Sequence, residues 1–177
     1  MRVITGEARG RKLVTLEGDD VRPTTDRVKE GMFNIIQFDL ENSTVLDLFA
    51  GSGQLGIEAL SRGARRCVFV DASSASLNVV KQNLTSTGLM SRASVFLGDS
   101  LAYLRHSSEL FDIVLLDPPY NKGLINEALP LLSGRTAEGA VIVCETSSQE
   151  NLPEKAGELQ LYREYKYGKI KLTVYKK

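Results

Sequence analysis

The segment that decides the fold is Val45-Leu46-Asp47-Leu48-Phe49-Ala50-Gly51-Ser52-Gly53-Gln54-Leu55-Gly56. An apolar run of strand length leads into glycines spaced as GxGxxG, and an amphipathic stretch follows. This strand–loop–helix pattern is typical of sites that bind nucleotides or nucleosides, because glycines let the backbone approach the ligand closely. Asp71 ends the next apolar run, about 20 residues on, where its carboxylate is expected to accept hydrogen bonds from two ribose hydroxyls.

Outside this segment, short apolar runs alternate with amphipathic stretches from Thr44 onward. The alternation predicts an α/β fold with a mostly parallel, Rossmann-like sheet and right-handed crossovers. We expect strands at 44–48, 67–71, 93–97, 111–117 and 140–145, and helices at 54–61, 73–85, 101–105 and 124–132. Two further runs, 159–165 and 170–175, predict an antiparallel hairpin at the C-terminus.

The residues before Thr44 have a different pattern. Residues 2–5 and 12–15 are expected to pair as a small β-hairpin, and 26–38 reads as a helix with Thr24 or Thr25 as its N-cap. We therefore divide the chain into an N-terminal extension, residues 1–43, and an α/β domain, residues 44–177.

Two acidic positions favour S-adenosylmethionine over NAD as the ligand of the glycine-rich loop. Asp47, just ahead of the glycines, would repel a pyrophosphate but would hold the cationic amino group of a methionine moiety. Asp99, in Gly98-Asp99-Ser100 at the end of a third strand, can accept a hydrogen bond from an adenine amino group. Acids after parallel strands lie where open sheets bind ligands. The predicted cofactor-binding residues are Asp47, Phe49, Gly51, Gly53, Asp71, Asp99 and Ser100.

Asp117-Pro118-Pro119-Tyr120 follows the apolar run 111–116, so it too lies at the carboxyl end of a predicted strand. The prolines stiffen the loop and remove backbone donors. Asp117 and the carbonyl of Pro118 are expected to accept hydrogen bonds from an exocyclic NH2 group while Tyr120 stacks on the base. Such contacts expose the nitrogen lone pair to an activated methyl group, so positioning supplies much of the rate and no metal is needed. The predicted catalytic residues are Asp117, Pro118 and Tyr120.

Length and composition are those of an ordinary globular protein. The 177 residues fit one domain with a hydrophobic core. The longest apolar runs fall short of the roughly 20 residues that cross a bilayer, and no signal-peptide pattern opens the chain. We expect a cytoplasmic protein without membrane contact. Cys67 and Cys144, isolated in apolar runs, are expected to be buried free thiols.

The charges cluster at the two ends of the chain although the formal net charge is zero. Basic residues open the chain against a lone Glu7, and others close it from Arg163 to Lys177. A positive rim of this kind would suit a nucleic acid. The same charges are equally compatible with ordinary solvated side chains.

Several blocks of the sequence resemble the RsmD family of bacterial 16S ribosomal RNA guanine-N2 methyltransferases. The N-terminal blocks 2–6, 9–13 and 22–30 carry the resemblance, together with 47–53, 55–64 and the Asp117–Tyr120 loop. The block 22–30 is the most specific, because the generic class I methyltransferase fold has no counterpart to it.

The resemblance implies methylation of one guanine N2, at position 966 of 16S ribosomal RNA, within an assembling 30S particle. It also implies RNA contacts by basic residues of the extension, namely Arg2, Arg9, Arg11, Lys12, Arg22 and Arg27. A DNA adenine-N6 or cytosine-N4 methyltransferase is the nearest alternative, but the chain has little room for a target-recognition region. A NAD-dependent oxidoreductase would leave Asp47 and the Asp117–Tyr120 loop without a role. A non-catalytic RNA-binding module is a third alternative.

Overall fold

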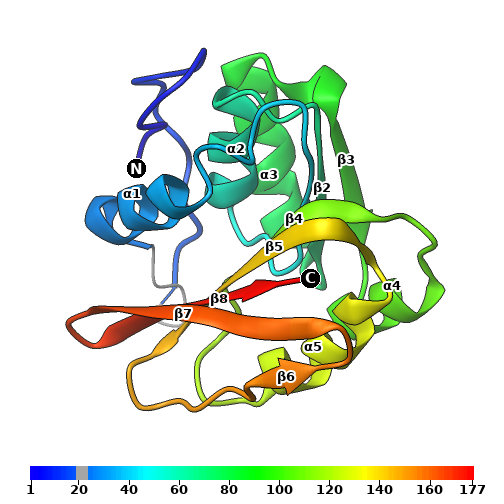
Figure 1. The fold of residues 1–177 in the computed structure, drawn as a ribbon. Coiled ribbons are helices and arrows are strands. Elements are labelled where there is room, and N and C mark those ends of the chain that lie inside the picture. Colours follow the sequence, from blue (N-terminus) through cyan, green and yellow to red (C-terminus); the bar gives the residue numbers. More distant parts are fainter. Residues whose placement is uncertain (19–23) are drawn as a thin grey trace.

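The structure, a computed structural model, describes residues 1–18 and 24–177 and confirms the predicted α/β fold class (Figure 1). The described residues form one sheet in the order β3-β2-β1-β4-β5-β8-β7-β6. Strands β1 to β5 run parallel to one another, and β8, the second strand of the C-terminal hairpin, returns antiparallel to β5. The strands are β1 Thr44–Asp47, β2 Arg66–Asp71, β3 Ala93–Leu97, β4 Phe111–Leu116, β5 Thr136–Ser147, β6 Lys155–Ala156, β7 Leu159–Tyr167 and β8 Ile170–Lys176.

Helices cover both faces of the sheet (Figure 1). Successive strand residues point to opposite faces, so Val45 packs in one hydrophobic cluster with α1, α2 and α3, while Leu46 packs in the other with α4 and α5. Both faces of the central strands are therefore dry, which explains their continuous apolar runs. The helical elements are α1 Asp26–Ile35, α2 Gln54–Ser61, α3 Ser74–Thr87, the 3₁₀ turn η1 Met90–Arg92, α4 Ser100–His106 and α5 Leu124–Ser133.

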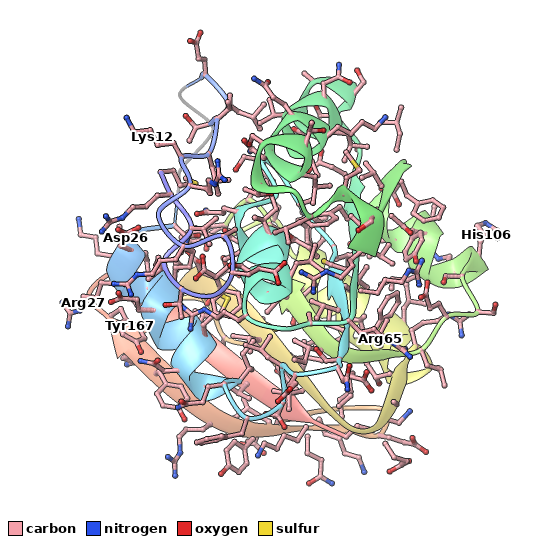
Figure 2. All side chains as sticks on the ribbon, turned by 90° about the horizontal axis from the view of Figure 1, so that it is seen from above. Lys12, Asp26, Arg27, Arg65, His106 and Tyr167 are labelled. Atoms are coloured by element: carbon pink, nitrogen blue, oxygen red, sulfur yellow. The ribbon has the colours of Figure 1, made fainter. Side chains whose placement is uncertain are left out.

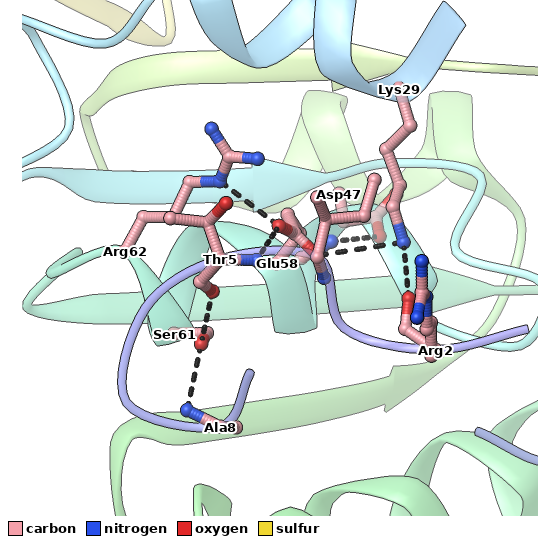
Figure 3. A network of polar contacts seen from close by, with 10 residues as sticks. Arg2, Thr5, Ala8, Lys29, Asp47, Glu58, Ser61 and Arg62 are labelled. Atoms are coloured by element: carbon pink, nitrogen blue, oxygen red, sulfur yellow. Dashed lines mark hydrogen bonds and ion pairs between the residues drawn. The ribbon is translucent and has the colours of Figure 1, made fainter. Parts of the chain in front are cut away.

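A buried ion pair fastens the N-terminal residues to α2 (Figure 3). Lys29 Nζ lies 3.5 Å from Glu58 Oε2, and both side chains have no exposed surface. Glu58 also accepts hydrogen bonds from the backbone N–H groups of Ile4 and Thr5, and Lys29 donates to the carbonyl of Arg2. Burial lowers the pKa of Lys29, while the nearby Glu58 carboxylate opposes that shift. The division at residue 43 stays a prediction, because residues on both sides of it share one hydrophobic cluster.

Two predictions for the N-terminal residues were wrong in detail. The expected hairpin is reduced to a single bridge between Arg2 and Lys12, beside which the N–H of Val3 donates to the carbonyl of Arg11 and the N–H of Leu13 to that of Met1. The pairing goes no further because the N–H groups of Ile4 and Thr5 donate to the Glu58 carboxylate. Helix α1 ends at Ile35, not at residue 38. The turn that follows it directs Leu40 into the core and leaves Phe38 exposed.

The expectation of buried free thiols is confirmed at Cys67 and Cys144. Within residues 1–18 and 24–177, no helix is both long and apolar enough to cross a membrane.

Candidate active site

A cavity of about 720 Å³ opens at the carboxyl ends of the parallel strands. Its volume is in the range of small-molecule sites. It brings together five of the seven predicted cofactor residues and all three predicted catalytic residues, although they come from different strands. The predicted residues on its wall are Phe49, Gly51, Asp71, Asp99, Ser100, Asp117, Pro118 and Tyr120.

The glycine-rich loop forms one wall of the cavity. Gly51 and Gly53 have φ angles of 56° and 82°, a left-handed conformation that favours glycine. A Cβ atom at Gly51 would meet no atom within 4 Å, so the cavity stays open beside the backbone there. Gly53 does not line the cavity; it begins α2 and packs near Val80. Gly56 serves packing, since an added Cβ would lie 2.3 Å from Phe69 Cε1.

Asp71 lies on the cavity wall at the end of β2. Its Oδ2 accepts a hydrogen bond from the N–H of Gly51 at 2.9 Å, and its Oδ1 accepts one from the N–H of Ser73, also at 2.9 Å. A carboxylate has about four lone-pair sites, so these two bonds leave acceptor capacity for ligand hydroxyls. The side chain therefore both holds the glycine loop and faces the cavity.

Asp99 and Ser100 lie where β3 ends and α4 begins. Asp99 is the N-cap of α4, and its Oδ1 accepts from the N–H of Ala102 at 2.8 Å. Ser100 is buried, and its hydroxyl donates to the carbonyl of Leu48 at 2.8 Å. The Asp99 bond caps the helix, and the Ser100 bond fixes its start against the loop that carries Phe49, which also lines the cavity.

The structure places Asp47 behind the glycine loop and not on the cavity wall. The residue is 1% exposed, and its Oδ2 accepts from the N–H of Gly56 at 2.9 Å. Burial raises its pKa to about 7, and the Gly56 bond opposes that rise. The expectation that Asp47 holds a ligand amino group directly does not fit this position, because the strand end is covered by the loop it supports.

The Asp117–Tyr120 loop lines the same cavity as the glycine loop, after the neighbouring strand β4. Pro118 is buried, and the following Asn121 has a left-handed φ of 61° and donates its N–H to Glu150 Oε1 at 2.5 Å. These features give the loop a fixed course between β4 and α5. The carboxylate of Asp117, the carbonyl of Pro118 and the ring of Tyr120 therefore lie together at the cavity.

Sequence reasoning missed two residues of this site, Glu145 and Thr24. Glu145 is 3% exposed, lines the cavity, and accepts a hydrogen bond from Tyr120 Oη at 2.5 Å. Thr24 Oγ1 lies 3.0 Å from Asp117 Oδ2 and 3.1 Å from Glu145 Oε2. In the parallel pairing of β4 with β5, Leu116 lies opposite Cys144, so the next residues, Asp117 and Glu145, lie side by side. The sequence feature that could have identified Glu145 is its position as an acid after an apolar run.

The predicted RNA-contacting residues from Arg2 to Lys12 belong to a segment that reaches the cavity only at its two ends. Met1, Thr15 and Leu16 line the cavity, so the segment that carries the basic side chains reaches it. Lys12 and Arg27 lie on the same side of the molecule, and His106 lies on the other (Figure 2). Arg27 is also 5.9 Å from the ring centroid of Tyr167 in the C-terminal hairpin. Among the basic residues predicted to contact RNA, those that the structure describes all have exposed side chains: Arg2, Arg9, Arg11, Lys12 and Arg27.

Two basic residues of the sequence do not add to this described, exposed set. Arg22 lies outside the described residues, so its predicted RNA contact stays a prediction. Lys171 of β8, one of the basic residues near the C-terminus, is 3% exposed and contacts the carbonyl of Glu150 and the carboxylate of Glu164. It is held within the protein and does not add to a positive surface.

The strand order, with an antiparallel strand inserted beside β5 and a glycine-rich loop after β1, defines a class I methyltransferase fold. The sequence profile of the family described as "Conserved hypothetical protein 95" matches residues 1–176. The chain therefore belongs to that family, the RsmD family.

Full-length relatives agree with this membership. YlbH of Bacillus subtilis (strain 168) is 40% identical over 182 residues, which cover 100% of this chain and 99% of the relative. Ribosomal RNA small subunit methyltransferase D of Escherichia coli (strain K12) is 35% identical and is covered to 90%. The solved structure of YhhF from Escherichia coli superposes with a TM-score of 0.90 at 32% identity, covering 100% of this chain and 97% of that chain.

Proposed function

We propose that the protein transfers a methyl group from S-adenosylmethionine to the exocyclic N2 of a guanine in 16S ribosomal RNA, within an assembling 30S particle. The observation that carries the proposal is a single cavity shared by the glycine-rich loop, Asp71 and the Asp117–Tyr120 loop. Relatives that match over the full chain include one named ribosomal RNA small subunit methyltransferase D, which supports the substrate class.

The charge of the cavity supports a cationic ligand over a dinucleotide. Four carboxylates line it, from Asp71, Asp99, Asp117 and Glu145, and its wall holds no Lys or Arg among residues 1–18 and 24–177. A pyrophosphate would be repelled there, whereas a ligand that carries a sulfonium and an ammonium group would be attracted. This electrostatic argument disfavours a NAD-dependent oxidoreductase.

Each side of the cavity has a separate task in the proposed reaction. When bound, S-adenosylmethionine supplies a methyl group activated by its sulfonium sulfur. Asp71 accepts from the ribose hydroxyls, the open backbone at Gly51 and Ser52 receives the methionine part, and Asp99 accepts from the adenine. Asp117 and the carbonyl of Pro118 accept from the two N–H bonds of the guanine amine. Tyr120 stacks on the base and thereby holds its lone pair toward the methyl group.

Exposed cations of the N-terminal extension suit an RNA substrate. Arg2, Arg9, Arg11, Lys12 and Arg27 can contact phosphates on either side of a guanine that is swung out into the cavity. A base in a loop costs less to extrude than one in a duplex. This difference favours RNA loops over the duplex substrate of a DNA amino-methyltransferase.

Transfer of labelled methyl groups to 16S RNA and to 30S particles, followed by mass mapping of the product nucleotide, tests the proposal. We expect N2-methylguanosine at one position and no transfer to duplex DNA. Asp117→Ala should abolish transfer and keep cofactor binding, because Asp117 faces the amine and not the ribose. Methyl groups on adenine or cytosine, or a fully active Asp117→Ala variant, would contradict the assignment.

A further inference from the structure

Four side chains of the cavity form one continuous hydrogen-bonded chain. Asp117 Oδ2 is 3.0 Å from Thr24 Oγ1, which is 3.1 Å from Glu145 Oε2. Glu145 Oε1 in turn accepts from Tyr120 Oη at 2.5 Å. Thr24 and Glu145 are 5% and 3% exposed, so bulk water does not separate these groups. The chain thus joins the two predicted catalytic side chains through two residues that sequence analysis did not assign.

The hydroxyl of Thr24 lies between two carboxyl groups and carries only one proton. A hydroxyl can donate one hydrogen bond and can accept others at the same oxygen. It can therefore donate to Glu145 while it accepts from Asp117, provided that Asp117 is protonated. Thr25, and not Thr24, caps α1, since Thr25 Oγ1 accepts from the N–H of Val28. The Thr24 hydroxyl thus has no part in starting that helix and faces the carboxylates instead.

Methylation of an amine requires that a proton leaves the site. The bond from carbon to the sulfonium sulfur breaks as the bond from carbon to nitrogen forms, and the nitrogen gains the positive charge that the sulfur loses. One N–H bond must then break to give the neutral methylated amine. Asp117, which faces this nitrogen in the proposed function, is the nearest base, and a proton that stayed on it would have to be removed before the next turnover.

We infer that Thr24 and Glu145 are positioning residues that carry this proton away from Asp117. The N–H bond breaks and an O–H bond forms on Asp117. That proton then passes to Thr24 Oγ1 as the original Thr24 proton passes to Glu145 Oε2, so Asp117 and Thr24 regain their starting forms and Glu145 is protonated. Glu145 lines the cavity and releases the proton to water that enters when the product leaves. The inference rests on the proposed amine methylation.

The same chain orients Tyr120. Because Glu145 accepts from Tyr120 Oη, the ring that would stack on the base is fixed by the residue that receives the proton. A purely structural Glu145 and a proton-accepting Glu145 differ in one testable respect. Glutamine can accept hydrogen bonds from Tyr120 or Thr24 but cannot take up a proton at neutral pH.

The test measures single-turnover methyl transfer to 16S RNA or 30S particles with the full chain in excess, for Thr24→Val, Thr24→Ser and Glu145→Gln. Calorimetry with S-adenosylhomocysteine and thermal unfolding are recorded for each variant. Thr146→Val is the matched control, because Thr146 is 1% exposed on the same strand as Glu145 and its hydroxyl has no hydrogen-bond partner among the described residues.

We expect Thr24→Val and Glu145→Gln to slow transfer by about 100-fold, the lower end for a lost proton-transfer group, with ligand affinity unchanged. Thr24→Ser, which keeps the hydroxyl, should restore most of the rate, and Thr146→Val should behave as wild type. A wild-type rate in Glu145→Gln or Thr24→Val overturns the relay and leaves the proposed function standing. If Thr24→Val fails to fold, Glu145→Gln decides alone. A wild-type protein that methylates no RNA overturns both.

Discussion

The backbone N–H of Gly51 donates a 2.9 Å hydrogen bond to Oδ2 of Asp71, which ties the glycine-rich loop to the end of the neighbouring strand β2. The loop therefore takes its shape from the same carboxylate that faces the cavity. Ligand recognition and loop geometry depend on one side chain, and a change there should affect binding through both.

Replacing Asp71 by Asn should weaken S-adenosylhomocysteine binding by about 10- to 100-fold, the value of one hydrogen bond to a charged group. The carboxylate now accepts hydrogen bonds from two backbone N–H groups, and the NH2 group of Asn would face one of them as a second donor. Isothermal calorimetry measures the change. Asp112→Asn is the control, since Asp112 accepts from the N–H of Thr44 at the opposite end of the strands. Equal affinities in the Asp71 variant and wild type would remove Asp71 from the site.

Gly56→Ala should lower the free energy of unfolding by about 1–3 kcal/mol, as expected for overpacking. The new Cβ would lie 2.3 Å from Phe69 Cε1 and 2.8 Å from Cys67 Sγ, between α2 and β2. Urea denaturation measures the loss. Gly134→Ala is the control, because its Cβ would have only the carbonyl of Leu131 nearby, at 3.8 Å. A Gly56 variant as stable as the control would show that the helix can move away from the sheet at little cost.

Asp47→Asn should change how stability depends on pH. Burial raises the pKa of Asp47 to about 7 from its usual 3.8. Below about pH 4 both folded and unfolded states are protonated. As pH rises toward 7 the unfolded state ionises first, so wild type loses stability and the loss is complete above pH 7.

Asn does not titrate, so the variant should escape this loss, which is on the order of 4 kcal/mol for a pKa raised from 3.8 to about 7. Urea unfolding at pH 4, 5.5 and 8 compares the two proteins, with Asp39→Asn, in the exposed turn after α1, as the control. If the free energies of unfolding of wild type and the Asp47 variant differ by the same amount at all three pH values, the raised pKa of the Asp47 carboxyl is contradicted.

Reversal of charge at Arg11 and Lys12 together should weaken RNA binding and leave S-adenosylhomocysteine affinity unchanged. Both side chains are exposed on the segment that reaches the cavity mouth, and each lost phosphate contact reduces the salt dependence of binding. Filter binding to 16S RNA at several salt concentrations measures the effect. The matched control is Arg105→Glu with Lys155→Glu, the same charge change on α4 and β6, away from that segment (Figure 1). Equal losses in both double variants would argue against a localised RNA surface.

Most of the fold could be predicted because its signals are local. Alternating apolar runs placed β1 to β5 and the C-terminal hairpin, and acids at strand ends placed Asp71, Asp99 and Asp117 around one cavity. The misplaced features depend on long-range partners. Glu58 accepts the backbone N–H groups of Ile4 and Thr5 and so shortens the expected pairing of residues 2–5 with 12–15 to one bridge. The loop over Asp47 hides a carboxylate that the sequence pattern would expose.

The roles of Thr24 and Glu145 could not be read from sequence for the same reason. Thr24 contacts residues 93 and 121 positions further along the chain. Nothing near Thr24 distinguishes it from Thr25, which is the actual helix cap. Only the register of β4 with β5 shows that Glu145 lies beside Asp117.

The most direct test of the account is a crystal structure of the protein with S-adenosylhomocysteine bound. We predict the ribose hydroxyls on the carboxylate of Asp71 and the sulfur turned toward the Asp117–Tyr120 loop, with room between them for a guanine amine. A ligand bound with its ribose away from Asp71, or with its sulfur directed away from that loop, would contradict the proposed transfer geometry.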